Sequence, residues 1–395
     1  MTKISSTPTV FSLPNSKWIK DFRQKLLAWY AEHARTLPWR GTTDPYEVWI
    51  SEIMLQQTTT ATVEGYYCRF LKRFPNPQML AEADNSEVLR YWEGLGYYRR
   101  AVQLHRAAQI IVSEHHGQFP STYDKILALP GIGRYTAGAI SSIAYHQRMP
   151  ILEANTIRLH SRLLAYPDDP TKSYGNKLLW QMAEIVLPEQ DNNAQNNGNN
   201  KQNTQYSVFN QALMDLGSMV CVPKSPDCPN CPVVKLCQAA QKGLQDMIPA
   251  LKKEQEFEER SEAALVIEKN GKYLMMRYPE GVRWAGLWDF PRHVVLSEQP
   301  LNYDTDFCLA IQQMTGYKVT ILSPLTTIRH SVTRFKITLN VYVAEVLENY
   351  GKSEYKIQWV KEKDLIKLAL NTTGRKITKL LDTDQRSHQK TLKLF

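Results

Sequence analysis

The sequence CVPKSPDCPNCPVVKLC places four cysteines in a short, proline-rich loop. They follow the spacing C-x6-C-x2-C-x5-C and are Cys221, Cys228, Cys231 and Cys237. Four thiolates this close along the chain can hold one iron–sulfur cluster. A structural zinc ion usually takes two C-x2-C pairs, and this loop contains one. The spacing therefore favours a [4Fe–4S] cluster, with zinc or free thiols as the alternatives.

A lone acid lies in an otherwise basic segment. Between Lys125 and Pro167, Glu153 is the only Asp or Glu, whereas five residues of this segment are Lys or Arg. Such a carboxylate either pairs with an arginine, Arg158 or Arg162, or stabilises a cationic intermediate. The residues alone leave both interpretations open.

The sequence LPGIGRYTAGAI, from Leu129 to Ile140, has the pattern of a helix-hairpin-helix. Its glycines, Gly131 and Gly133, permit a tight turn. The amides at the start of the following helix, near Arg134, can then bind a phosphate. Such a motif contacts the DNA backbone without reading its bases. A plain turn between two helices is the alternative.

These groups need a helical framework to position them. Up to about residue 248, apolar residues recur at spacings of three and four, which predicts helices. Two helix starts are marked in the sequence, one by Asn15 or Ser16 as N-cap and one by Asp44 followed by Pro45. Further helices are predicted over 86–94, 100–114, 135–144 and 156–165.

The pattern changes in the second half of the chain. Residues 191–205 are rich in asparagine and predict a solvated insertion loop. Residues 249–261 are charged and predict a linker. Beyond them, over 262–395, alternating apolar residues predict an α+β domain. Two apolar runs around Asn270-Gly271 predict its first hairpin.

The bulk composition points to a polyanionic partner. A chain of 395 residues is too long for one ordinary hydrophobic core, so more than one domain is expected. Its composition, with 43% hydrophobic and 22% charged residues, is typical of globular domains. The net charge of +9 and the pI near 9.1 favour nucleic acid over an anionic membrane surface. We find no apolar run of about 18 residues and no signal-peptide core, so we expect a cytosolic, reducing setting.

Several motifs together resemble one family. WISEIMLQQTTTATV, WEGLGYYRRAVQLHRAAQ, LPGIGRYTAGAI and FNQALMDLGSMVC occur in this order, with the cysteine loop behind them. They resemble the MutY adenine DNA glycosylases of the endonuclease III superfamily. The resemblance implies a multidomain protein: an all-α helix-hairpin-helix glycosylase domain over 1–248 with an iron–sulfur loop at 221–237, followed by an α+β Nudix-like domain over 262–395. It is dense from about Leu26 to Cys237 and looser beyond.

The resemblance also implies a reaction. The superfamily's bifunctional lyases carry a Lys where this chain has Tyr135, so we expect a monofunctional enzyme. Breaking the bond to adenine needs an acid that stays protonated, and burial raises the pKa of such a carboxyl group. Glu52 fits, because its neighbours in the sequence are apolar; the alternative is an ordinary acid on a helix surface. Tyr135 and Arg40 are expected to line the adenine pocket, with Arg35 and Trp39 as weaker candidates.

Glu153 matches the position of a family Asp that stabilises the sugar cation. The family motif is like I-L-D-G-N-V, whereas this chain has Glu153, Ala154 and Asn155 at the D, G and N places. The carboxylate is retained on a longer side chain, beside added bulk. A displacement of about 1 Å can cost about a hundredfold in rate. The chemical type persists, so we expect Glu153 and Asn155 to act in catalysis.

The DNA contacts implied by the resemblance lie on two loops. The sequence LQQT carries Gln56, Gln57 and Thr58, which match the loop that fills the gap left by a flipped base. Tyr97 in GLGYY matches a residue that wedges beside the opposing purine. The alternatives are a polar loop residue for Gln57 and a core aromatic for Tyr97.

The C-terminal part resembles the Nudix-like domain with which the family recognises 8-oxoguanine. The family's recognition loop is like H-x-F-S-H, and Val332, Thr333 and Arg334 occupy its last three places. Thr333 retains a hydroxyl that donates and accepts hydrogen bonds, and Arg334 brings a permanent charge. Lesion preference is therefore expected to be altered, and an ordinary strand lead-in is the alternative.

We therefore expect a base-excision repair enzyme that removes adenine opposite 8-oxoguanine or guanine in double-stranded DNA. It would act as a monomer in the bacterial cytoplasm, on the nucleoid, without membrane attachment. Two alternatives stay open. One is a mismatch glycosylase for another base; the other is a lesion-binding protein whose catalysis is weakened by the changes at Glu153 and Ala154.

Overall fold

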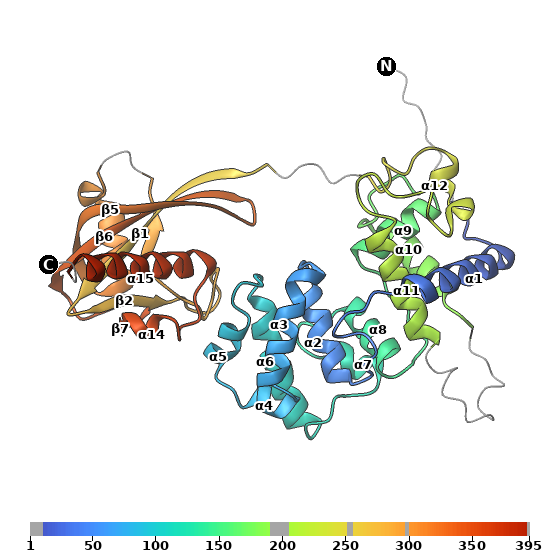
Figure 1. The fold of residues 1–395 in the computed structure, drawn as a ribbon, viewed down its shortest axis with the longest axis horizontal. Coiled ribbons are helices and arrows are strands. Elements are labelled where there is room, and N and C mark those ends of the chain that lie inside the picture. Colours follow the sequence, from blue (N-terminus) through green and yellow to red (C-terminus); the bar gives the residue numbers. More distant parts are fainter. Residues whose placement is uncertain (1–10, 190–204, 251–255, 297–299, 393–395) are drawn as a thin grey trace, which may run out of the picture. The chain divides into compact units, whose positions relative to one another are not determined.

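The computed structural model describes residues 11–189, 205–250, 256–296 and 300–392 (Figure 1). Apart from Gln205, the predicted insertion loop lies outside these residues. The chain divides into two compact units: the first holds residues 1–78 and 107–253, the second 79–106 and 254–395. Among the described residues, no helix is long and apolar enough to cross a membrane.

The first unit is helical. Its helices are α1 (Ser16–His33), α2 (Pro45–Leu55), α3 (Thr60–Arg73), α7 (Tyr123–Leu127), α8 (Arg134–Ile143), α9 (Ala154–Leu163), α10 (Ser173–Val186), α11 (Gln205–Met219), the short 3-10 helix η2 (Val234–Leu236) and α12 (Gln238–Gln241). Three more lie wholly or partly in the second unit: α4 (Pro77–Ala81), α5 (Asn85–Tyr91) and α6 (Arg99–Glu114).

Both marked helix starts are confirmed. Asn15 Oδ1 accepts from the amide of Trp18 at 3.0 Å. Asp44 Oδ1 accepts from the amide of Tyr46 at 2.8 Å, and Pro45 is the first residue of α2. An N-cap of this kind stabilises a helix by about 1 kcal/mol. The caps therefore fix where α1 and α2 begin, and α2 carries Glu52.

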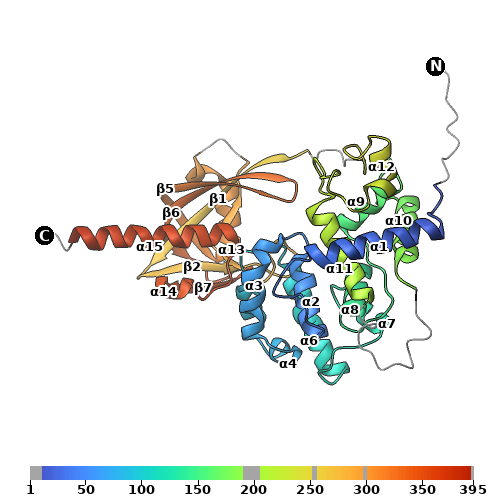
Figure 2. The ribbon, with the colours of Figure 1, turned by 45° about the vertical axis from the view of Figure 1, so that its right-hand side comes forward.

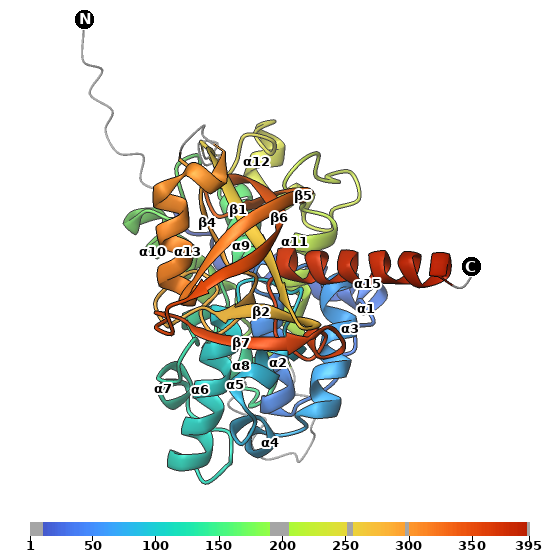
Figure 3. The same cartoon turned by 90° about the vertical axis from the view of Figure 1, so that its left-hand side faces the viewer.

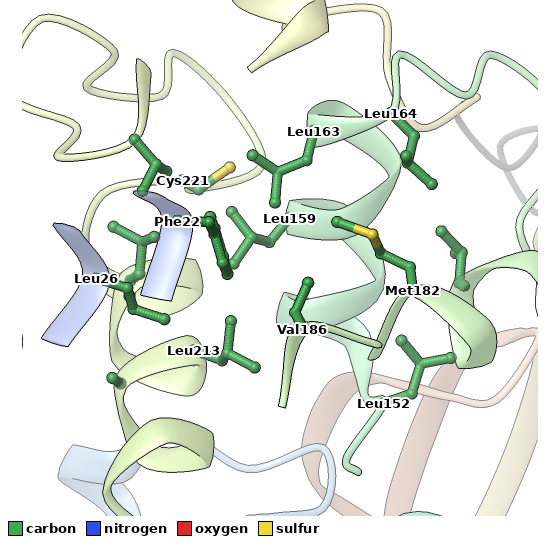
Figure 4. Close-up of a cluster of buried hydrophobic side chains, with 14 of the residues drawn as sticks. Phe22, Leu26, Leu152, Leu159, Leu163, Leu164, Met182, Val186, Leu213 and Cys221 are labelled. Atoms are coloured by element: carbon green, nitrogen blue, oxygen red, sulfur yellow. The ribbon is translucent and has the colours of Figure 1, made fainter. Parts of the chain in front are cut away.

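One cluster of buried apolar side chains packs α1, α9, α10 and α11 together (Figure 4). Phe22 of α1 and Leu159 of α9 lie in it, both essentially inaccessible to water. Burying such a side chain contributes about 1.5–3 kcal/mol. Leu152 and Cys221 belong to the same cluster, so the core holds both the residue before Glu153 and the first cysteine of the loop.

Figure 2 shows α2, α8 and α11 beside one another in the first unit, and residues of α8 contact both α2 and α11. Gly131 has φ +79°, which an L side chain rarely adopts, so a glycine suits this turn between α7 and α8. The helix-hairpin-helix arrangement is thus present, and its second helix faces the helix that carries Glu52.

The second unit contains a seven-stranded sheet with the order β3-β2-β1-β6-β5, in which β4 also pairs with β1 and β7 with β2. The strands are β1 (Glu258–Lys269), β2 (Lys272–Arg277), β3 (Trp288–Asp289), β4 (Arg292–Val294), β5 (Tyr317–Val332), β6 (Phe335–Asn349) and β7 (Lys356–Lys361). The accompanying helices are η3 (Leu301–Tyr303), α13 (Thr305–Thr315), α14 (Glu362–Leu365) and α15 (Thr372–Leu392).

Alternating residues of β1 enter two different cores. Ala264 and Val266 pack in a cluster with Ile377 of α15, whereas Leu265 packs in another with Phe307 of α13. Since successive side chains of a strand point to opposite faces, α13 and α15 cover opposite faces of the sheet. Figure 3 shows these two helices on either side of the strands.

The predicted hairpin is confirmed and the predicted linker is too long. Asn270 and Gly271 have φ +53° and +68° and connect β1 to β2. However, β1 begins at Glu258, inside the segment 249–261 predicted as a linker. Its first residues pair with β6, and the Arg260 guanidinium lies 4.2 Å from the centre of the Phe335 ring. The first residues of β1 are charged, so the sequence pattern did not indicate where the strand begins.

Candidate active site and nucleic-acid contacts

Glu52 and Tyr135 form a direct hydrogen bond. Glu52 lies on α2 and is 5% exposed; Tyr135 lies near the start of α8 and is half-buried. The Tyr135 hydroxyl donates to Glu52 Oε2 at 2.6 Å. The packing of α2 against α8 thus joins two of the predicted pocket residues.

Burial decides the protonation of this pair. It raises the pKa of Glu52, and the nearby Glu153 carboxylate acts in the same direction. The Tyr135 hydrogen bond and the positive charge of Arg40 oppose this shift. Burial likewise holds the pKa of Tyr135 well above its ordinary value. The site therefore favours a protonated Glu52 and a neutral Tyr135, as general acid chemistry requires.

Glu153 is the N-cap of α9. Its carboxylate accepts from the amides of Asn155 and Thr156, each at 2.9 Å, and from Asn155 Nδ2 at 3.2 Å. The Thr156 hydroxyl in turn accepts from the Glu153 amide, which completes a capping box. Burial raises the pKa of Glu153, whereas these amides and Arg158 lower it. The longer side chain thus still reaches the helix start.

The two arginines proposed as structural partners of Glu153 donate elsewhere. Arg158 donates to Asn155 Oδ1 at 2.9 Å and to the carbonyl oxygens of Gly217 and Cys221. Arg162 donates to carbonyl oxygens of the cysteine loop and its flank. The structural role of Glu153 is therefore helix capping, a role that the sequence interpretation had not considered.

Gly217 brings α11 against the start of α9. A Cβ atom there would lie 2.8 Å from the Cβ of Asn155, closer than such atoms approach. Arg158 Nη2 donates to the Gly217 carbonyl oxygen at 2.6 Å and to Asn155 Oδ1 at 2.9 Å, so it links the two helices. A larger residue would displace the start of α9, which carries both Glu153 and Asn155.

The expected pocket arginines share one acid. Asp215 of α11 accepts from Arg35 Nη2 at 2.6 Å and from Arg40 Nη2 at 3.0 Å. Arg40 also donates to Gln211 Oε1 and, at 3.2 Å, to the Tyr30 hydroxyl.

Asp215, Gln211 and Tyr30 were not predicted from the sequence. A usable signal was present for Asp215, because it is the one acidic residue in the sequence of α11. Trp39 is 6% exposed and packs edge-on against Tyr67, so its ring belongs to the core.

All four cysteines line one cavity. Its wall also includes Leu159, Arg162 and Val233. Arg162, 2% exposed, lies 3.3 Å from the Cys221 sulfur through Nη1. In the described part of the chain, no three or more His, Cys, Asp or Glu side chains are arranged so that they could hold a metal ion.

Two of the predicted DNA-contacting loops have unusual backbones. Gln57, just after α2, has φ +56° and is exposed, and Gln56 Nε2 donates to Thr136 Oγ1 at 3.3 Å. Tyr97 has φ +46° and is 58% exposed, so it is not a core aromatic. Residues other than glycine adopt such conformations at a cost of about 1–3 kcal/mol, often at functional sites.

The guanidinium of Arg134, at the start of α8, lies 3.7 Å from the centre of the Trp180 ring. Arg134 is an exposed residue. Gly133 is the N-cap of the same helix.

The residues at the recognition-loop position form a hairpin tip. Val332 pairs with Phe335, so Thr333 and Arg334 are the two turn residues between β5 and β6. Both are exposed, and Thr333 has φ +52°. Arg334 Nε lies 3.4 Å from Glu258 Oε1. They are therefore turn residues rather than an ordinary strand lead-in.

Comparison with known proteins agrees with this architecture. Residues 50–184 match the HhH-GPD superfamily base excision DNA repair protein, and residues 262–380 match the NUDIX domain. The chain is 32% identical to the adenine DNA glycosylase of Rattus norvegicus, over 92% of this chain and 78% of that one. It is 36% identical to the adenine DNA glycosylase of Buchnera aphidicola subsp. Schizaphis graminum, over 68% of this chain and 74% of that one. A solved thermostable thymine-DNA glycosylase aligns with a TM-score of 0.50 at 29% identity, covering 57% of this chain and 98% of that chain.

Proposed function

The chain belongs to the adenine DNA glycosylase family, and from this premise we propose that it removes adenine paired with 8-oxoguanine or guanine in double-stranded DNA. It is an adenine-specific DNA glycosylase, with a helix-hairpin-helix fold followed by a Nudix-like domain. We assign the glycosylase domain to residues 1–248 and extend the second domain from 262–395 back to Glu258.

The first chemical step is assigned to Glu52. The target adenine must leave the base stack before side chains can reach it. Glu52 then gives its proton to N7 of the adenine, and the C1′–N9 bond breaks with its electron pair passing to the base. The observation that carries this assignment is the 2.6 Å hydrogen bond from Tyr135 to a buried, protonation-favouring Glu52. Tyr135 holds the carboxyl group in one orientation.

The second step is assigned to Glu153 and Asn155. The sugar left behind is an oxocarbenium ion, which a carboxylate stabilises. Water adds to C1′ and gives up a proton, for which Glu153 is the acceptor. The amides that cap α9 through Glu153 keep its carboxylate in place. Because Tyr135 replaces the lyase lysine, the proposed mechanism needs no Schiff base.

A single-turnover assay tests this function against its alternatives. Enzyme in excess is mixed with duplexes carrying adenine opposite 8-oxoguanine, guanine or thymine, and with duplexes carrying uracil or thymine opposite guanine. We expect adenine release from the first two duplexes only. Release of thymine or uracil would instead indicate a glycosylase for another base. Tight binding of the adenine mispairs without base release would indicate a lesion-binding protein.

We assign the four cysteines to a [4Fe–4S] cluster. A shared cavity lined by Cys221, Cys228, Cys231 and Cys237 supports this, as does the buried Arg162 beside one sulfur, because the bound thiolates are anionic. Burial raises the pKa of Cys231 to about 12, so this thiol is unreactive unless a metal deprotonates it. The cluster would order the loop that packs against α9. Iron analysis of the purified protein tests the assignment; bound zinc without iron would contradict it.

The remaining contacts are assigned to DNA. Gln56, Gln57 and Thr58 would fill the space left by the adenine, and Tyr97 would wedge beside the opposing purine. Gly131, Gly133 and Arg134 would bind backbone phosphates. Thr333 and Arg334, exposed at a hairpin tip, would contact the opposing base. We expect a monomer that acts on DNA in the bacterial cytoplasm.

A further inference from the structure

A buried acid, Asp215, contacts both arginines that we expect at the adenine pocket. Asp215 has no exposed side-chain surface and comes from α11. It accepts from Arg35 Nη2 at 2.6 Å and Nε at 3.0 Å, and from Arg40 Nη2 at 3.0 Å. One carboxylate therefore neutralises one of two guanidinium charges, and the group of three carries a net charge of +1.

Arg40 is fixed by more than this acid. Its second terminal nitrogen donates to Gln211 Oε1 and to the Tyr30 hydroxyl. Its side chain is 15% exposed, so water screens its charge weakly. The same charge acts on Glu52 and on Tyr135. Whatever holds and balances Arg40 therefore affects the proton on the acid.

We propose that Asp215 is a positioning residue: its hydrogen-bonded ion pair holds Arg40 in place and balances the charge that Arg40 directs at Glu52. The groups that face Glu52 are Tyr135 from α8, Glu153 at the start of α9 and Arg40 from the segment before α2. Asp215 acts on Glu52 through Arg40. The inference rests on the proposed role of Glu52 as the acid.

The direction of the effect follows from electrostatics. Without the negative charge at position 215, Arg35 and Arg40 would together carry +2. A stronger positive field stabilises the Glu52 carboxylate and lowers the pKa of Glu52. The protonated fraction then falls at neutral and alkaline pH, while acidic solution restores it. A purely structural role for Asp215 would instead reduce activity equally at every pH.

Asp215→Asn, which keeps the shape and removes the charge, tests this. The rate of adenine release from an adenine:8-oxoguanine duplex is measured under single turnover from pH 5.5 to 8. We expect a loss of about tenfold at pH 8 that shrinks to about twofold at pH 5.5, since each pKa unit changes the protonated fraction about tenfold. Adding Arg35→Met returns the net charge to +1 and should restore the original pH dependence. Glu184→Gln, which breaks a surface pair with Arg148, is the matched control and should leave the profile unchanged.

The outcomes separate this inference from the proposed function. If Glu52→Gln still releases adenine, the assignment of the acid fails. If Glu52→Gln is inactive but Asp215→Asn shows the wild-type pH dependence, only the inference about Asp215 fails. A pH-independent loss in Asp215→Asn that Arg35→Met does not reverse would also overturn it. Thermal unfolding of each variant shows whether a loss of rate comes from loss of fold.

Discussion

Glu52 and Thr333 lie in contrasting surroundings. Glu52 is 5% exposed, is hydrogen-bonded to Tyr135 and is enclosed by helices of the first unit. Thr333 is exposed at a two-residue turn of the second unit, where its hydroxyl donates to the adjacent carbonyl oxygen of Val332. The nearby pair of Arg334 and Glu258 is more than half exposed on both sides. Protein atoms thus determine the chemistry of Glu52, whereas a bound partner would determine that of Thr333.

The difference in burial between Glu52 and Thr333 affects how well each position and its surroundings tolerate substitution. A buried acid is tuned by every neighbour, so a substitution nearby alters its protonation or its geometry. An exposed turn has few neighbours, and ion pairs there contribute about 0–1 kcal/mol. Where the family motif has Asp, Glu153 accordingly retains a carboxylate, and this carboxylate caps α9. At the turn, Val332 is smaller than the family's Phe, Thr333 retains the hydroxyl of its Ser, and Arg334 replaces its His. The β5–β6 ladder still pairs Val332 with Phe335.

The largest expected effect is at the buried acid. Glu52→Gln preserves the shape of the side chain but cannot give a proton to adenine. We expect single-turnover cleavage to fall by about a thousandfold, in the range typical of general acids. Affinity for the adenine:8-oxoguanine duplex, measured with a cleavage-resistant 2′-fluoro-adenosine, should stay within about threefold. Cleavage at more than a tenth of the wild-type rate would contradict the assignment of Glu52 as the acid, and with it the contrast between Glu52 and Thr333.

Glu153 tests whether the buried site tolerates a change of length. Glu153→Gln removes the charge that we propose stabilises the sugar cation, and it should lower the rate about a hundredfold. Glu153→Asp shortens the side chain and should keep the rate within about tenfold, because Asp is a good N-cap and can accept from the same amides. A gain well above tenfold in Glu153→Asp would show that the longer natural residue is compromised.

At the exposed tip we expect a change in selectivity and none in chemistry. Thr333→Ala and Arg334→Ala should each reduce the preference for 8-oxoguanine over guanine by about fivefold, the value of one hydrogen bond. The preference is the ratio of dissociation constants at a fixed salt concentration, because the salt sets the affinity. Thr327→Ala is the control, since Thr327 lies on the same strand and donates to Asn340. Equal effects in all three variants would remove the special role of the tip.

The smallest expected effect is on stability. Burial raises the pKa of Glu52 above its value in the unfolded chain, so folding favours its protonated form. That contribution is complete at acidic pH and is lost as the pH rises through the pKa in the folded protein. Glu52→Gln does not ionise and should therefore melt about 2–4 °C higher than the wild type at pH 8, with no gain at pH 4. Thr333→Ala should leave the melting temperature unchanged at both values.

Local signals in the sequence predicted local structure. Asp44 with Pro45 marked the start of α2, and Asn270-Gly271 marked a hairpin, because each acts through its own backbone. The start of β1 was misjudged, since its charged residues are stabilised by pairing with β6, far along the chain.

The sequence predicted the site residues that match the family's motifs, but it did not predict the contacts between them. Glu52 and Tyr135 were paired through a family resemblance, and their 2.6 Å contact depends on the packing of α2 against α8. Asp215 was missed because its partner Arg40 lies 175 positions away. The capping role of Glu153 was missed because Glu is an uncommon N-cap. Such roles depend on contacts that no spacing in the sequence encodes.

The titration of Glu52 itself tests the central claim most directly. Protein labelled with ¹³C at the glutamate carboxyl groups is titrated by NMR without DNA, and the resonance missing from Glu52→Gln identifies Glu52. We predict that this resonance titrates at a pH clearly above that of the exposed glutamates, because burial outweighs the opposing charge of Arg40. Titration at or below the ordinary range of a glutamate would contradict the account, since Glu52 would then hold no proton at neutral pH.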